Sequence, residues 1–311
     1  MRLKIRLCRV GLRRYSSRSL QFVFVVIFLL VVLVFVSRRT SDVCQSKHRM
    51  CEFCILAEND KLSLNASYYK DMDLRIIVLV YNRADSLQRL LDSINRAHYL
   101  GDNIALHVWI DRSENGTLDR RTIKVAQSFT FKHGQYYVHN QTCHVGIYGQ
   151  WIGAWYPRNG SSEFAVILED DLTVSPYFYK WIKLVHAKYD HRRDVNGYAL
   201  QGISIKHGIR KHGYLDVKKT HKVFLYPVLG TWGFSPNNRN WRAFSNWYMS
   251  VRRDKKFAPF VDGLLPSVWY MTNNNNMWSM WFIYYAWIQG EYTVYSNFVV
   301  EDGAQEVRQS P

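Results

Sequence analysis

Phe164-Ala165-Val166-Ile167-Leu168-Glu169-Asp170-Asp171-Leu172 runs from five apolar residues straight into three consecutive carboxylates. The unbroken, partly β-branched apolar run predicts a fully buried strand. The three acids cannot all be buried without partners, because removing an isolated carboxylate from water is costly. A bound divalent cation would relieve their repulsion; the alternative is a solvated turn whose acids cap the next helix. Since ligands bind beyond the carboxyl ends of strands in open α/β sheets, the stretch predicts an α/β protein with a metal-assisted site.

Strand-like and helical segments alternate around this stretch. Apolar residues at helical spacing run from Leu87 to Ile94, an aromatic helix is expected from about Tyr148 to Trp155, and Ser175-Pro176 predicts the start of another helix. Such alternation predicts a mostly parallel, doubly wound sheet in a domain that spans residues 73–311. The expected strands are residues 75–80, 104–110, 136–138 and 164–168, with a closing strand at 292–300.

Polar side chains follow three of the expected strands. Arg83 comes after the first, Asp111 ends the second, and the acids of residues 169–171 end the fourth. In a doubly wound sheet these ends converge on one edge. The planar fork of an arginine suits a diphosphate, a carboxylate can accept from a base or a ribose, and clustered acids suit Mn²⁺ or Mg²⁺.

These segments resemble the GT-A glycosyltransferases, and in particular N-acetylglucosaminyltransferase I and its O-mannose-linked relatives. The likeness is carried by residues 80–83 (Val-Tyr-Asn-Arg), 108–111 (Val-Trp-Ile-Asp) and, above all, the acidic strand-turn-helix of residues 165–178. It extends over about residues 74–300 and is specific only in the first half.

The resemblance implies a role for each matching residue. Asp171 would be the direct metal ligand, with Glu169 and Asp170 serving the ribose and the metal-bound waters. Two positions on other segments would contact the diphosphate and the uracil ring, namely Arg83 and Asp111. Tyr148 falls where the family has a nucleotide-contacting side chain, although a core position is the plainer interpretation of this tyrosine, and Arg83 has the plainer interpretation of a surface residue at a helix start.

The implied activity is transfer of a sugar from a UDP-sugar, with UDP-GlcNAc favoured by resemblance, to a glycan or glycoprotein acceptor. The reaction would be a direct, inverting displacement assisted by Mn²⁺ or Mg²⁺ and a general base. Where the family carries that base, this chain has Ser279 and Met280. Asp262 and Glu291 are the nearest candidates for the base. Without a base, the chain would be a non-catalytic, membrane-anchored sugar-binding or nucleotide-sugar-binding relative; a luminal adhesion domain with bound Ca²⁺ is a third interpretation.

The N-terminal residues differ in kind from the rest. A basic tail, residues 1–19, precedes an apolar segment, residues 20–37, which ends just before Arg38-Arg39. The apolar run from Leu20 to Val36 would span about 25 Å at ~1.5 Å per residue, adequate for a thin early secretory bilayer. A cleaved signal peptide is the competing interpretation, but the long basic region and the paired arginines argue against it. The charge distribution predicts a cytosolic N-terminus and a luminal remainder, hence a single-pass type II protein of the Golgi or endoplasmic reticulum membrane.

The luminal part is expected to begin with a polar stem, residues 38–72. The chain holds 41 Lys and Arg against 25 Asp and Glu, and nine of those bases precede residue 40, so the luminal surplus is modest and fits an anionic small substrate rather than nucleic acid. An even number of luminal cysteines in an oxidising space predicts disulfides whose pairing is left open: Cys44, Cys51, Cys54 and Cys143. Glycosylation sequons on the same side support the topology: Asn65, Asn115, Asn140 and Asn159.

Overall fold

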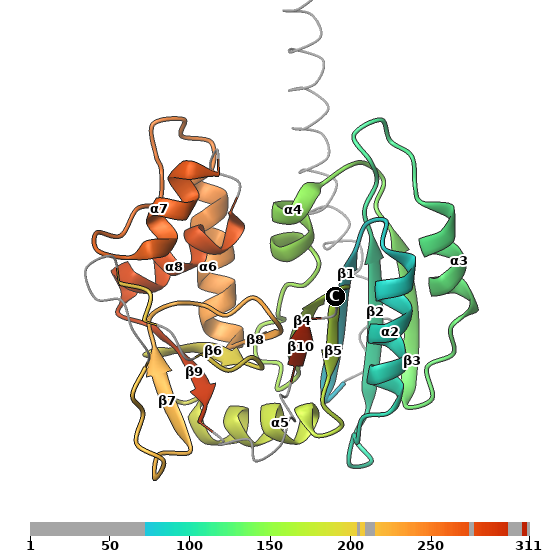
Figure 1. The fold of residues 1–311 in the computed structure, drawn as a ribbon, viewed down its shortest axis with the longest axis horizontal. Helices are drawn as coiled ribbons and strands as arrows, with labels where there is room; N and C mark the ends of the chain where they lie inside the picture. The colour runs from blue at the N-terminus through green and yellow to red at the C-terminus, as the bar shows by residue number, and fades with distance from the viewer. Residues whose placement is uncertain (1–71, 204–205, 209–214, 274–276, 298–306, 310–311) are drawn as a thin grey trace, which may run out of the picture. The chain divides into compact units, whose positions relative to one another are not determined.

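The central element is a mixed, mostly parallel eight-stranded sheet (Figure 1). The computed structural model describes residues 72–203, 206–208, 215–273, 277–297 and 307–309. The strands of this sheet, in spatial order, are β3 (Gly134–Asn140), β2 (Ile104–Ile110), β1 (Leu74–Val80), β4 (Phe164–Glu169), β8 (Phe234–Pro236), β6 (Val195–Ala199), β9 (Tyr292–Ser296) and β7 (Val223–Tyr226). Strands β1 to β4 are parallel, β8 runs antiparallel to both of its neighbours, β9 is parallel to β6, and β7 is antiparallel to β9.

Helices cover both faces of the sheet, as expected for a doubly wound α/β fold. Helices α2 (Ala84–Asn95), α3 (Arg120–Ser128) and α5 (Phe178–Tyr189) contribute to one hydrophobic core. Helices α4 (Gly146–Gly153), α6 (Asn238–Val251), α7 (Leu265–Thr272) and α8 (Trp278–Gln289) contribute to the other. The predicted α/β class is therefore confirmed for the described part of the chain.

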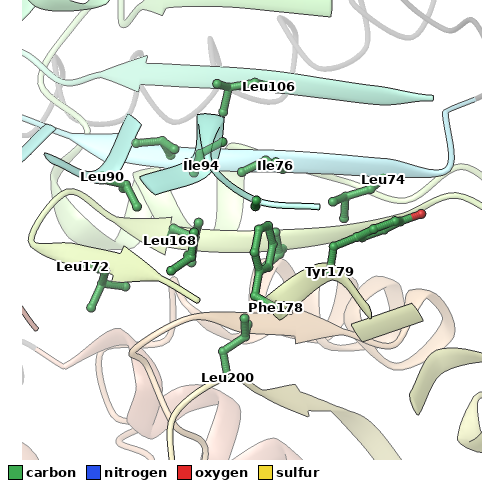
Figure 2. Close-up of a cluster of buried hydrophobic side chains, with 14 of the residues drawn as sticks. Leu74, Ile76, Leu90, Ile94, Leu106, Leu168, Leu172, Phe178, Tyr179 and Leu200 are labelled. Atoms are coloured by element: carbon green, nitrogen blue, oxygen red, sulfur yellow. The ribbon is translucent and has the colours of Figure 1, made fainter. Parts of the chain in front are cut away.

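The first core forms between the parallel strands and α2 and α5. Figure 2 shows side chains of β1, including Leu74 and Ile76, together with Leu90 of α2 and Phe178 of α5. These side chains are fully buried. The apolar runs predicted as strands are buried along their whole length in β1 and β2, because helices cover both faces.

The second core is dominated by aromatic side chains. Trp151 of α4 stacks on Trp278 at the start of α8, with ring centroids 4.2 Å apart, and Trp241 of α6 meets Trp278 edge to face. Aromatic contacts of this kind add stability beyond the area they bury. They join the regular first half of the sheet to the helices of the second half.

Several boundaries differ from those expected. Helix α5 begins at Phe178, so Ser175 is not its N-cap; the Ser175 hydroxyl instead accepts from the Tyr177 amide in the preceding turn. Beyond the acids, a second small sheet joins β5 (Leu172–Val174) to β10 (Val307–Gln309) in antiparallel register, which the sequence did not predict.

The predicted tail, membrane segment and stem, residues 1–19, 20–37 and 38–72, lie outside the described residues except for Met72, as do Cys44, Cys51 and Cys54. In the described part of the chain, each helix is too short or too polar to cross a bilayer.

Candidate functional site

The strand order creates a switch point between β1 and β4. From β1 the chain moves outward to β2 and β3, and it then returns to place β4 on the other side of β1. Ligands of open α/β sheets bind at such a point, beyond the carboxyl ends of the strands. Arg83 follows β1 here, and Leu79 of β1 is paired with Glu169 of β4. We call Glu169, Asp170 and Asp171 the acidic rim.

The Arg83 guanidinium spans two carboxylates of the acidic rim. Its Nη1 lies 2.9 Å from Asp171 Oδ2, and its Nη2 and Nε lie 2.5 and 3.2 Å from the two oxygens of Asp170. The Arg83 side chain is 51% exposed, whereas those of Asp170 and Asp171 are 2% and 17% exposed. The structure thus brings Arg83 and the aspartates together, and one cation faces two adjacent anions.

The Glu169 side chain lies on the face of the sheet that helix α4 covers, and it contacts that helix. The indole Nε1–H of Trp151 donates to Glu169 Oε1 at 2.9 Å. Burial, with a smaller contribution from Asp171 and Asp170, raises the pKa of Glu169 to about 7 despite this hydrogen bond. Burial likewise raises the pKa of Asp170 to about 6, against the opposing effect of Arg83.

The acidic rim suits a hard divalent cation by its chemistry. Its donors are carboxylate oxygens, and Asp171 is the more exposed of the two aspartates. Within the described ranges, no three or more His, Cys, Asp or Glu side chains form a group that could hold a metal. A cation at Asp171 would therefore depend on ligands from substrate phosphates and water, as Mg²⁺ sites commonly do.

Asp111 organises the main chain at the end of β2. Its Oδ1 accepts from the amides of Arg112 and Val145 at 2.8 and 3.0 Å, and its Oδ2 accepts from the amide of Gly146 at 2.9 Å. His144 Nδ1 lies 3.3 Å from Oδ2. The buried carboxylate thus fixes the N-terminus of α4 beside the switch point. The predicted contact of Asp111 with uracil stays a prediction.

Tyr148 lies on α4, but its side chain belongs to the second aromatic core. It is half-buried against Met277 and Trp281, and burial raises its pKa. Of the two interpretations of this residue, the core position agrees with these contacts.

The structure does not bring Glu291 to the acidic rim. Glu291 precedes β9 and interacts with Asn240 at the start of α6, where the neighbouring Asn238 donates to Glu163 O at 2.7 Å. Glu163 directly precedes β4, so Glu291 is at the amino-terminal edge of the sheet. Asp262 is exposed in the loop before α7, with no described contact to the acidic rim. Met280, at one of the positions where the resemblance would place an acid, is fully buried.

Two residues that support the site were missed. Trp151 holds Glu169, and the Gln150 side-chain amide donates to the carbonyls of Val80 and Trp109 at 3.2 Å each. Gln150 thereby ties α4 to the ends of β1 and β2. The signal in the sequence is the single amide side chain in the otherwise apolar helix 146–153.

No family model matches the chain, and no curated protein matches it significantly. Solved structures with a similar fold include TarS 1–349 of S. aureus, which is 12% identical at a TM-score of 0.43 over 75% of this chain and 59% of that one. Another is the mannosyltransferase PcManGT from Pyrobaculum calidifontis in complex with GDP-Man and Mn²⁺, 13% identical at a TM-score of 0.36 over 62% and 56% of the two chains. This chain therefore matches less than two thirds of the length of either structure. At these scores the likeness concerns the fold alone.

Proposed function

We propose that the protein is a metal-dependent glycosyltransferase that uses a nucleoside diphosphate sugar, with UDP-GlcNAc as the favoured donor and a glycan or glycoprotein as acceptor. The observation that carries the proposal is the meeting of Arg83 with Asp170 and Asp171 at the switch point between β1 and β4. A guanidinium whose donors match phosphate oxygens and carboxylate oxygens of the kind that hard cations prefer lie side by side there, beyond the strand ends where ligands bind to open α/β sheets.

Each residue has a physical role in this proposal. Asp171 would hold Mn²⁺ or Mg²⁺, and Asp170 and Glu169 would orient its water ligands and the ribose. When bound, the cation would neutralise charge on the departing diphosphate. Arg83 carries a guanidinium whose donors match phosphate oxygens, and Asp111 would accept from the base.

A second candidate function is donor binding without transfer. It is favoured by the positions of the two candidate bases, because Glu291 lies at the amino-terminal edge of the sheet and Asp262 is an exposed loop residue. A general base must come within hydrogen-bond reach of the acceptor hydroxyl. Measurement of sugar turnover decides between the two candidate functions. Inversion at the anomeric carbon belongs to the transferase alone, because it requires that the sugar be transferred.

The test measures UDP binding by calorimetry with and without Mn²⁺, and turnover of UDP-sugars, in the wild type and in Asp171→Asn. We expect Mn²⁺-dependent UDP binding in the wild type and a loss of at least about tenfold in the variant. Asp85→Asn is the matched control, because Asp85 is an exposed aspartate on α2 whose partner is Arg121. Absence of Mn²⁺-dependent UDP binding by the wild type would rule out the transferase. Binding without hydrolysis or transfer of any UDP-sugar would establish the non-catalytic function.

We further propose that residues 20–37 anchor the domain on the luminal side of a Golgi or endoplasmic reticulum membrane. Three sequon asparagines within the described ranges support this proposal, because Asn115, Asn140 and Asn159 are all exposed and accessible to glycosylation. Protease protection of the glycosylated domain in sealed microsomes tests it, and a protease-sensitive, unglycosylated domain would contradict it.

A further inference from the structure

Trp232 is an exposed tryptophan on the loop that leads into β8. Its side chain is 43% exposed, whereas tryptophans of the second core such as Trp241 and Trp278 are buried. Phe234 of β8 is paired with Ile167 of β4 in antiparallel register. Because β8 runs antiparallel to β4, the loop before β8, which carries Trp232, lies at the edge of the sheet that carries the acidic rim.

The loop that carries Trp232 is tightly held. The Trp232 amide donates to Gln201 Oε1 at 2.7 Å. The Gly233 amide donates to the Thr231 carbonyl at 3.0 Å, and the Leu200 amide donates to the Gly233 carbonyl at 2.9 Å. Gly233 has a φ of 83°, in the left-handed region that favours glycine. The exposed indole therefore stands on a turn fixed at both sides, which limits the entropy lost when a ligand binds to it.

Gly230 shows how closely this loop packs. A Cβ atom at Gly230 would lie 2.7 Å from the Gln201 side-chain amide carbon and 2.8 Å from the Tyr295 hydroxyl. Gln201 follows β6, whose carboxyl end reaches the same edge of the sheet. The packing holds Gln201 where its side chain accepts from the Trp232 amide, so the residues that follow β6 brace the loop before the neighbouring strand β8.

The order of residues along this edge matches the order of groups in a nucleotide sugar. Across β2, β1, β4 and β8 the edge presents Asp111, Arg83, the acidic rim and then Trp232. Neighbouring strands are about 4.8 Å apart, so Trp232 lies two strand spacings, on the order of 10 Å, beyond the strand of Arg83. A sugar joined to a diphosphate at Arg83 and Asp171 would extend in this direction.

We propose that Trp232 is the aromatic platform for the pyranose ring of the donor, which packs its C–H face on the indole. This inference rests on the proposed function and adds to it the residue that recognises the sugar. When the pyranose packs on the indole, its apolar C–H groups are removed from water, and the exposed indole offers a large flat surface for them. Selectivity for a sugar nucleotide over the free nucleotide would then come from Trp232.

The test compares the Kd of UDP with that of UDP-GlcNAc, UDP-Gal and UDP-Glc, all with Mn²⁺, in the wild type, Trp232→Ala and Trp232→Phe. We expect Trp232→Ala to weaken binding of the best UDP-sugar by about tenfold and to leave UDP binding within about twofold. Trp232→Phe keeps an aromatic face and should retain most of the sugar-dependent affinity. Trp287→Ala is the matched control, since Trp287 is 56% exposed at the other end of α8 from Trp278 and should alter neither affinity.

Three results separate the possibilities. Equal weakening of UDP and UDP-sugar binding by Trp232→Ala, or no weakening of either, overturns the platform. Unchanged donor binding together with a raised KM for the acceptor assigns the indole to an acceptor sugar and also overturns the proposal as stated. A wild type that binds no UDP sinks the proposed function itself, whereas the first two results leave that function intact.

Discussion

The indole Nε1–H of Trp151 donates to the carboxylate of Glu169 at 2.9 Å, and this bond fastens helix α4 to the end of β4. Asp111 holds the first amides of the same helix, and Gln150 holds its middle to the ends of β1 and β2. Helix α4 is therefore tied to the ends of β1, β2 and β4, beside the switch point. Its position and the position of the acidic rim depend on each other.

Replacement of Trp151 by phenylalanine should reveal this dependence. The ring stacked on Trp278 is retained, but the buried Glu169 carboxylate loses its donor, so we expect the free energy of unfolding to fall by about 1–3 kcal/mol. Denaturant unfolding provides the measurement. In a Glu169→Gln background the same replacement should cost less, because a neutral amide tolerates burial better, and strictly additive effects would show that the two side chains are not coupled.

Arg83 should be irreplaceable by lysine. Lysine carries the charge but lacks the planar fork that reaches both Asp170 and Asp171. We expect Arg83→Ala to lower stability by about 1–2 kcal/mol, a figure reduced for the half-exposed guanidinium, and both variants to weaken UDP binding. Calorimetry and thermal unfolding measure the two effects. Arg121→Ala, which breaks an exposed pair with Asp85, is the control with little expected change, and an Arg83→Lys variant equal to wild type would contradict the prediction.

Glu291 should make the fold less stable at neutral pH. Burial raises its pKa to about 7 from an ordinary value of 4.5, so the folded protein binds more protons than the unfolded chain between these values. Stability contributed by the protonated form is therefore lost as the pH rises through this window. The uncharged Glu291→Gln variant should be more stable than wild type by about 1–3 kcal/mol at pH 8 and similar to it at pH 4.

The same variant tests the base assigned from sequence. Because Glu291 lies at the amino-terminal edge of the sheet, Glu291→Gln should retain any sugar transfer that the wild type performs. If the free energy of unfolding of the wild type and of Glu291→Gln changed equally between pH 4 and pH 8, the pH effect would not come from Glu291. Loss of turnover in a folded Glu291→Gln variant would restore the catalytic role.

A pair formed by the buried His107 and the partly buried His139 should give the free energy of unfolding the opposite pH dependence. His107 Nδ1 and His139 Nε2 are 3.0 Å apart, and His107 Nε2 lies 3.1 Å from Arg75, whose own carboxylate partner is Glu163. Burial lowers the pKa of His139 to about 4 from 6.5, so the unfolded chain binds more protons in this range and stability is lost as the pH falls below 6.5. We expect His139→Gln to reduce the loss between pH 6.5 and 4.5 by about 1–2 kcal/mol in urea titrations. An unchanged slope would exclude His139 as the source.

The regular half of the fold was predictable because its strands are marked by continuous apolar runs in the sequence. Apolar runs such as residues 76–80 and 165–168 are buried, and parallel strand ends meet at one edge, which brought Arg83 and the acidic rim together. The second half was not predictable in this way. Strand β8 has only three residues, too few for a periodicity, and its antiparallel direction is set by pairing with β4 and β6.

The positions of Glu291 and Trp232 follow from this difference. Glu291 was considered as a base on chain position alone, but the direction of β9 places it at the amino-terminal edge. Trp232 stands out only once Gly233 and the β4–β8 register are known.

The pairing of β5 with β10 has a consequence for how the chain matures. Leu172–Val174 follow the acidic rim directly, and their antiparallel partners are Val307–Gln309, the last described residues. While a ribosome is still adding these residues, β1 to β4 have everything they need to pair, but the strand that leaves the acids does not. The turn that carries the acidic rim therefore gains its partner strand only after Val307–Gln309 have been added, and a chain cut short before Val307 would leave β5 without it.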